Sequence, residues 1–279
     1  MKRWAAVWMA YVLFAGLCDT ALQAQDDLLE IQTDEREQME RDIFAATVSV
    51  RTAPPLRLSG GELLRYTVRW EFIEAGTAEL ACSTETVDRR RVYRITAQSR
   101  SAPSLDRVYF VRNRTDSYVD VHGFYTLKFT KEQNENGRLS SEYVLYDHSG
   151  NRWWSLTTMT TGYLPAGTMD VVAALYYVRS IPLRVGAPLS VAVHSGDRVY
   201  PLIVEVLRRE TVDVRGTPYD CFLVEPKVDL KRFPLFRARG RLLVWLTADD
   251  HRVPVRLQSR LFIGSVYADL VERIAPVYR

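Results

Sequence analysis

Strict alternation of apolar and polar residues is the feature that most constrains the fold of this chain. The pattern begins just after Gly60, where polar residues separate five large apolar ones: Leu64, Tyr66, Val68, Trp70 and Phe72. Successive side chains of a β-strand point to opposite faces, so a period of two places all five on one face. The stretch therefore predicts a half-buried strand.

The same pattern recurs along most of the chain. Short turns separate the segments, and Asn136-Gly137 supplies the positive φ angles that a tight hairpin needs. The remaining candidate strands are 78–83, 91–99, 107–120, 124–133, 138–147, 151–158, 188–194, 198–208, 211–215, 219–225, 240–247, 252–262 and 265–274. Closely spaced strands favour an all-β protein in which one large antiparallel sheet curves into a barrel-like or sandwich-like single domain.

One segment, residues 168–180, departs from this alternation and predicts a helix. Thr168 or Asp170 can cap its start, and Pro182 prevents its continuation. A single helix among strands either lines or plugs a curved sheet, or simply packs against it. The fold class is therefore all-β with one buried or lining helix.

The first residues predict export. In residues 1–24, two basic residues precede an uncharged apolar run over 4–17, and Ala24 is the expected last residue before cleavage. As a helix this run spans about 21 Å, which is short of the roughly 30 Å hydrocarbon core, so a signal peptide is favoured over a membrane anchor. Lipidation at Cys18 is disfavoured because Leu17 precedes it. We expect the protein in the periplasm or at the periphery of the outer membrane.

The expected domain organisation follows. Residues 1–24 form the signal peptide, and residues 25–59, rich in Glu, Gln and Asp, form an acidic tether or a loose helix. Residues 60–279 form the curved antiparallel β domain. No later apolar stretch approaches 18 residues, so we expect no transmembrane helix in the mature chain.

Charge and motifs argue against several function classes. The net charge is only +3, with 37 basic and 34 acidic residues, so we expect no nucleic-acid partner. The four histidines show no metal-binding spacing, and neither a nucleophile elbow nor a phosphate-binding glycine loop is present. We expect no catalytic residues, metal or cofactor. The cluster Asp249-Asp250-His251 is interpreted as a turn between strands, with hydrolysis there a remote alternative.

A basic segment at 227–241 interleaves arginines and lysines with aromatic residues. It is a candidate for contact with anionic lipid head groups, because bases meet phosphate while aromatics meet acyl chains. The alternative is a surface hairpin whose phenylalanines enter the core. The candidate contact residues are Lys231, Arg232, Phe233, Phe236 and Arg237.

Six residues are candidates for a binding site on the curved sheet. Trp70, Tyr177 and Trp245 would form its wall. Arg179 would be the polar anchor at its mouth, oriented by Glu74 and Asp170. The competing interpretation places the tryptophans in the core and Arg179 at the C-terminus of the helix, where a cation is favoured by the helix dipole.

Cys82 and Cys221 both fall on apolar strand faces. In an oxidising compartment they could form a disulfide, but buried free thiols are also common. The sequence does not distinguish between a disulfide and two free thiols.

Several motifs together resemble a bacterial exported family described as domain of unknown function 3108. The similarity covers about residues 60–274. The motifs are Gly61-Glu62-Leu63 with Tyr66 and Trp70, Ala75-Gly76-Thr77-Ala78, residues 170–179 with Pro182-Leu183, Tyr219-Asp220-Cys221 with Glu225-Pro226, Gly240 with residues 245–250, Val253-Pro254-Val255 and Ile263-Gly264-Ser265. The resemblance implies an all-β exported protein without an assigned activity. One departure is Val172-Ala173, where the resemblance would place a serine.

Two functions are compatible with these observations. The first is an exported protein that binds or carries an amphipathic or lipid-like ligand, because a curved sheet with aromatic residues can enclose one. The alternative is a structural or assembly factor of the cell envelope that contacts partner proteins through its sheet edges.

Overall fold

The computed structural model describes residues 60–228, 241–260 and 264–275. Within these residues, fourteen strands form one antiparallel sheet in the order β8-β7-β6-β5-β4-β3-β2-β1-β14-β13-β12-β11-β10-β9. Sequential strands are neighbours everywhere except β8 and β9, which are the two edges, and at the centre β1 also pairs with β14. The sheet thus brings the two ends of the described chain together.

The strands cover most of the described chain. In the first half they are β1 Glu62–Trp70, β2 Ile73–Val87, β3 Arg90–Ser101, β4 Val111–Asp120, β5 Thr126–Glu135, β6 Arg138–Asp147, β7 Arg152–Ser155 and β8 Thr160–Tyr163. The helix α3, Val171–Ser180, follows. In the second half they are β9 Leu189–Ser195, β10 Arg198–Val214, β11 Thr217–Val228, β12 Arg241–Thr247, β13 Pro254–Arg260 and β14 Ser265–Ile274. The predicted all-β class is confirmed, and the described residues contain the helix that was expected.

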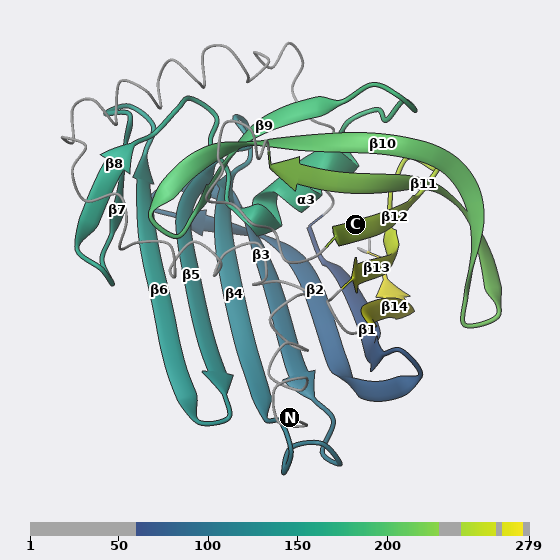
Figure 1. The fold of residues 1–279 in the computed structure, drawn as a ribbon. Coiled ribbons are helices and arrows are strands. Elements are labelled where there is room, and N and C mark those ends of the chain that lie inside the picture. Colours follow the sequence, from purple (N-terminus) through teal and green to yellow (C-terminus); the bar gives the residue numbers. More distant parts are fainter. Residues whose placement is uncertain (1–59, 229–240, 261–263, 276–279) are drawn as a thin grey trace.

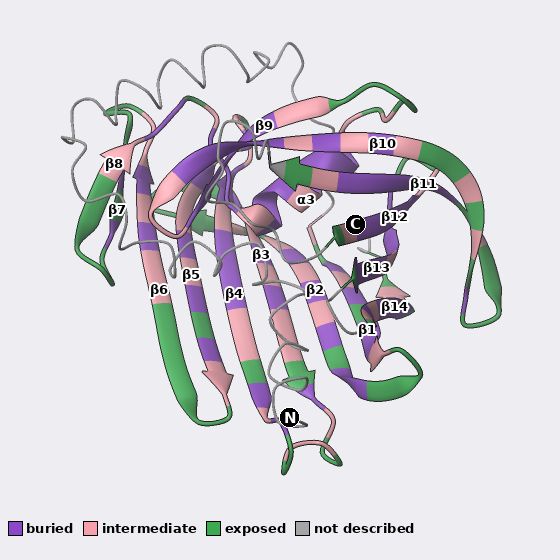
Figure 2. Cartoon of the chain, in the orientation of Figure 1, coloured by how far each residue is buried: buried purple, intermediate pink, exposed green. Residues whose placement is uncertain are grey.

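The sheet curves around α3 without closing. Strands β9, β10 and β11 run across the ends of β2 to β6, and the helix lies between these two parts (Figure 1). Buried residues concentrate around the helix, whereas the hairpin ends far from it are exposed (Figure 2). Strands β8 and β9 are the two edges of the open sheet. A barrel-like shape therefore results from bending alone.

Strand β1 illustrates why the alternation produces this sheet. Leu64 and Tyr66 are buried on the inner face, and the hydroxyl of Tyr66 donates to the carbonyl oxygen of Pro254 at 2.8 Å. On the outer face, Arg65 forms ion pairs with Glu79 on β2 at 3.0 Å and with Glu272 on β14 at 2.6 Å. Opposite charges on neighbouring strands support the register that burial of the apolar face selects.

The curvature has a local origin in register shifts. The pairing slips within β1, in the β4–β5 pair, in the β10–β11 pair and in the β12–β13 pair. An extra residue on one strand bends that strand and increases the local twist. These irregularities let a sheet of fourteen strands wrap around one short helix.

The two ends of the sheet meet at a seam. The backbone of Met169 bridges to Val193 on β9, and the backbone N–H of Thr126 on β5 donates to the carbonyl of Thr168 at 3.2 Å. A second, smaller core lies at this seam and joins side chains of β5, β6 and β7 to those of β9 and β10: Phe129, Val144, Tyr146, Trp153, Leu164, Ala192 and Val199. Side-chain packing and the backbone contacts of the segment before α3 therefore hold the two ends of the sheet together, although the sheet itself is not closed by a strand pair.

His194 lies at the same seam and is fully buried. Its Nδ1 is 3.0 Å from the hydroxyl oxygen of Tyr146, and its ring lies 4.5 Å from that of Trp153. In the described part of the chain, its Nε2 has no hydrogen-bond partner. Burial lowers the pKa of His194 to about 3, an effect that outweighs the attraction of the Asp197 carboxylate. The imidazole is therefore neutral in the folded protein near neutral pH.

Some sequence expectations about the strands were wrong. Phe72 is not the last inward residue of β1, because the strand ends at Trp70 and Phe72 lies in the following turn. The expected strands 198–208 and 211–215 form one continuous β10, since the chain makes a register shift between Val206 and Arg208 and has no turn at residues 209–210. Strand β8 was not predicted. The Asn136-Gly137 turn is confirmed, with φ angles of 52° and 80°.

Candidate functional site

The N-terminus of α3 is held by Asp170, as the capping pattern predicted. Its carboxylate accepts hydrogen bonds from the backbone N–H groups of Val172 and Ala173 at 2.8 and 3.0 Å. The hydroxyls of Ser117 on β4 and Thr126 on β5 donate to the same carboxylate. Burial raises the pKa of Asp170, and these four hydrogen bonds counteract part of that effect. One side chain thus caps the helix and attaches it to two strands.

We expect Asp170→Ala to lower the free energy of unfolding by about 1–2 kcal/mol. The substitution removes the cap and leaves the buried hydroxyls of Ser117 and Thr126 without their acceptor. Asp170→Asn should lower it less, because its amide oxygen still accepts from the helix N–H groups. Urea unfolding followed by circular dichroism measures both changes, and equal losses in the two variants would contradict the capping role.

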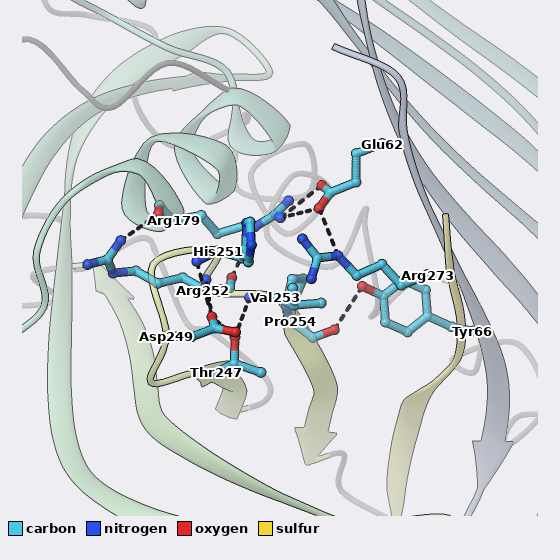
Figure 3. A network of polar contacts seen from close by, with 10 residues as sticks. All are labelled: Glu62, Tyr66, Arg179, Thr247, Asp249, His251, Arg252, Val253, Pro254 and Arg273. Carbon is cyan, nitrogen blue, oxygen red and sulfur yellow. Dashed lines mark hydrogen bonds and ion pairs between the residues drawn. The ribbon is translucent and has the colours of Figure 1, made fainter. Parts of the chain in front are cut away.

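At the other end of α3, two arginines each hold the backbone carbonyl of the other (Figure 3). Arg179 Nε donates to the carbonyl of Arg252 at 3.0 Å, and Arg252 Nη1 donates to the carbonyl of Arg179 at 3.4 Å. Arg179 is 4% exposed and forms an ion pair with Glu62 at the start of β1, at 2.8 Å. Arg273 on β14 lies 3.7 Å from the same carboxylate. The network ties the helix end to both halves of the sheet.

The turn that carries Arg252 is shaped by Asp249. Its carboxylate accepts from the backbone N–H groups of His251 and Arg252 at 3.1 Å and from the hydroxyl of Thr247 at 2.6 Å. Burial alone would raise the pKa of Asp249, but these hydrogen bonds bring it below its usual value. The carboxylate is engaged in turn geometry, which supports the interpretation of Asp249-Asp250-His251 as a turn between strands.

An apolar pocket lies between α3 and the sheet half formed by β9 to β13. Its cavity volume is about 90 Å³, and it opens to solvent. From the helix, the lining residues are Val171, Val172, Ala174, Leu175 and Val178; from the sheet, they are Val193, Tyr200, Leu202, Val204, Val224, Pro226, Leu242, Val244, Leu246 and Leu257. No charged side chain is among them. A pocket of this chemistry suits a hydrocarbon group.

None of the six predicted ligand-binding residues lines this pocket, and their role in binding stays a prediction. Arg179 lies in the buried network described above, and Asp170 caps the helix. Tyr177 packs in the core against Phe124, with ring centroids 5.7 Å apart.

The remaining three lie on strands outside the pocket. Trp245 is buried and its indole Nε1 donates to Glu210 at 2.9 Å, so it belongs to the packing of β12. Trp70 is half-buried at the end of β1, and Glu74 is exposed near the start of β2. The wall of the pocket is instead built from aliphatic residues, which the search for aromatic and charged anchors passed over.

Several predictions concern residues outside the described ranges. The five candidate residues of the basic segment, Lys231 to Arg237, lie there. The predicted signal peptide and the acidic segment 25–59 lie there as well. These stay predictions.

Cys82 and Cys221 are both buried and unpaired. Burial raises the pKa of each thiol to about 12, so both are protonated near neutral pH. They form no disulfide and pack as small apolar groups.

Within residues 60–228, 241–260 and 264–275, no cluster of three or more His, Cys, Asp or Glu side chains is arranged to hold a metal ion. In the same ranges, no helix combines the length and the apolar character that crossing a bilayer requires.

Comparison with known proteins places the chain in a structural context. The model of a family described as protein of unknown function (DUF3108) matches residues 65–271. Among solved structures, the fold is similar to a crystal structure of a β-barrel-like protein of domain of unknown function DUF1849 from Brucella abortus. The TM-score is 0.51 at 12% identity, covering 78% of this chain and 98% of the other. At this identity the likeness concerns the fold alone. A search of curated proteins finds no match.

Proposed function

This chain belongs to the DUF3108 family of proteins of unknown function, and from that premise we propose that it binds the hydrocarbon part of an amphipathic, lipid-like ligand. The observation that carries the proposal is the pocket between α3 and strands β9 to β13. Its lining is aliphatic except for Tyr200. The sequence further supports an exported protein that performs this task in the cell envelope, because residues 1–24 have the pattern of a signal peptide.

The chemistry of the wall limits what enters the pocket. A charged group transferred into an aliphatic pocket loses its hydration without gaining a partner, so the charged part of a ligand stays outside. An alkyl or isoprenoid chain loses no hydrogen bonds on entry and gains roughly 25 cal/mol for each Å² of apolar surface removed from water. The ligand class is therefore an uncharged chain that carries any polar group at its solvent end.

The pocket predicts binding of a small apolar probe and its loss when the pocket is filled. Purified protein titrated with N-phenyl-1-naphthylamine should show a saturable rise in fluorescence. Leu175 on the helix and Leu242 on β12 are half-buried and line opposite walls. We expect Leu175→Trp and Leu242→Trp each to weaken probe binding by about tenfold or more, because an indole occupies the space of the probe.

The matched control is Val271→Trp, at a partly exposed position of β14 outside the pocket. This variant should bind the probe like the unmodified protein, and circular dichroism checks that all variants fold. Native mass spectrometry after mild extraction from cells then tests whether a ligand copurifies with the protein. Unchanged binding in both pocket variants would exclude this pocket, and a protein that takes up no probe would refute the proposal.

A role in envelope assembly is the second candidate, and the open sheet favours it. Strand β9 is an edge, and among the described residues its backbone meets a further segment only around Met169. An edge strand can accept a strand of another protein. Crosslinking in cells discriminates between the two functions, because protein adducts would favour assembly and lipid adducts would favour carriage.

A further inference from the structure

Strand β9 separates the apolar pocket from the smaller core at the seam. Val193 lines the pocket between α3 and the sheet, whereas the next residue, His194, contacts Tyr146 on β6 and Trp153 on β7. Adjacent side chains of a strand point to opposite faces, so this one strand forms a wall of both spaces. A displacement of β9 at the seam therefore changes the shape of the pocket.

Two backbone hydrogen bonds fix β9 to the segment that leads into α3. The N–H of Met169 donates to the carbonyl of Ala192 at 3.0 Å, and the N–H of His194 donates to the carbonyl of Met169 at 2.8 Å. The first two residues of the helix, Val171 and Val172, line the pocket together with Val193. The two hydrogen bonds therefore hold the start of the helix to the β9 wall of the pocket.

The surroundings of His194 suit only a neutral ring. Its Nδ1 contacts the hydroxyl of Tyr146, and its buried Nε2 has no hydrogen-bond partner in the part of the chain that the structure describes. A protonated imidazole has a donor on both nitrogens and a positive charge, so the closed seam would bury an unpaired N–H and an uncompensated charge. Burial accordingly lowers the pKa of His194 to about 3. In mild acid, a proton binds to this ring only when the seam opens and the ring reaches water.

The other ionisable groups near the seam respond differently to acid. Asp197, in the turn after β9, favours protonation of His194, but burial outweighs its attraction, and Asp197 also pairs with the neighbouring arginine at 3.0 Å. Burial raises the pKa of Asp170, so proton uptake by this carboxyl favours the closed seam. His148, in the turn after β6, is half-buried and donates from Nε2 to a backbone carbonyl of β5 at 2.8 Å, a bond that protonation preserves. Of these groups, His194 is the one whose protonation opposes the closed seam.

We propose that the seam is an acid-operated gate of the pocket: protonation of His194 releases β9 from Met169, and the pocket then loses its hydrocarbon ligand. This inference rests on the proposed function, because it assigns regulation to the same pocket. Near neutral pH the ring is neutral and the seam stays closed. In acid the open state binds a proton that the closed state does not, so each pH unit below 6.5 favours opening about tenfold. Without the β9 wall, the hydrocarbon chain is again exposed to water and its affinity falls.

Hydrogen exchange measured by mass spectrometry on the purified protein tests the opening. Peptides that contain residues 166–170 and 190–195 report on the seam, and peptides from β2 and β3 report on global unfolding. After correction for the intrinsic exchange rate at each pH, we expect the seam amides to exchange faster than those of β2 and β3. Their opening equilibrium should rise about thirtyfold between pH 7.5 and 5.0. Circular dichroism at pH 5.0 checks that the sheet remains folded.

His194→Gln should abolish this rise, because glutamine does not titrate but can still form a hydrogen bond with Tyr146. His194→Phe is a second variant that does not titrate and that keeps a ring against Trp153. The matched control is His122→Gln, since His122 is exposed and its replacement should leave the rise unchanged. The proposal is overturned if the seam exchanges no faster than β2 and β3, or if both His194 variants open like the unmodified protein.

Bound N-phenyl-1-naphthylamine tests the link between the seam and the pocket. The affinity of the unmodified protein for this probe should weaken roughly tenfold from pH 7.5 to 5.0, because only the closed state binds it. His194→Gln should retain the probe at pH 5.0. Probe affinity that is independent of pH while the seam opens would also overturn the proposal. A protein that binds no probe at either pH, yet opens through His194, would refute the proposed ligand binding and leave the acid-operated opening intact.

Discussion

Glu62→Gln is expected to lower the free energy of unfolding by about 3–5 kcal/mol, the range typical of breaking a buried ion pair. The reason is Arg179, whose guanidinium is buried beside the Glu62 carboxylate at 2.8 Å. Glutamine leaves that positive charge in the interior without its counter-charge. Equilibrium unfolding in urea measures the loss.

Removing both charges should restore most of the stability. The double variant Glu62→Leu with Arg179→Met removes the buried pair as a whole, so neither partner is left without its counter-charge, and the apolar side chains fill the volume. The exposed pair Arg209–Asp220 on β10 and β11 is the control, and Asp220→Asn should change the free energy of unfolding little, because solvent screens both charges. If Glu62→Gln proved as mild as Asp220→Asn, the network would not anchor the helix.

Acid sensitivity that depends on His194 is the second large effect. An unfolded chain protonates histidine near pH 6.5, whereas burial lowers the pKa of His194 to about 3 in the folded protein. Above pH 6.5 both states are neutral at this site and it contributes no pH dependence. As the pH falls from 6.5 towards 3, the unfolded chain binds a proton that the folded protein does not. This difference lowers stability by about 1.4 kcal/mol per pH unit.

His194→Phe should flatten this dependence, because phenylalanine keeps a ring against Trp153 but does not titrate. The measurement is the free energy of unfolding at several pH values between 7.5 and 4.5. His122→Gln is the control, since His122 is exposed and its replacement should leave the slope unchanged. Equal slopes for the unmodified protein and His194→Phe would show that another group governs unfolding by acid at the seam.

The sequence predicted the local structure well where burial alternates. Leu64 and Tyr66 face the core as expected, and Asp170 caps the helix. The prediction failed at Phe72 and at β10, because alternation does not reveal where a strand turns. A register shift and a tight turn interrupt the alternation of apolar and polar residues in the same way. Only the pairing with the neighbouring strand determines which of the two forms.

The candidate site was harder to predict for a different reason. Val171, Leu175 and Val178 recur at helical spacing, so the sequence places them on one face of α3, and they line the pocket. Their partners come from five strands, and an aliphatic residue facing a cavity has the same pattern as one facing a filled core. Charged residues such as Arg179 were interpreted as ligand anchors, although Glu62 satisfies that charge from a strand more than one hundred residues earlier.

Periodicity and turn residues alone determined the β character of this protein and the position and cap of its helix, because these depend on interactions between near neighbours in the chain. Tertiary structure decided how far the sheet bends, which edges meet at His194 and where the pocket remains unfilled. Each of these depends on contacts between residues far apart in sequence, whose geometry no local pattern encodes.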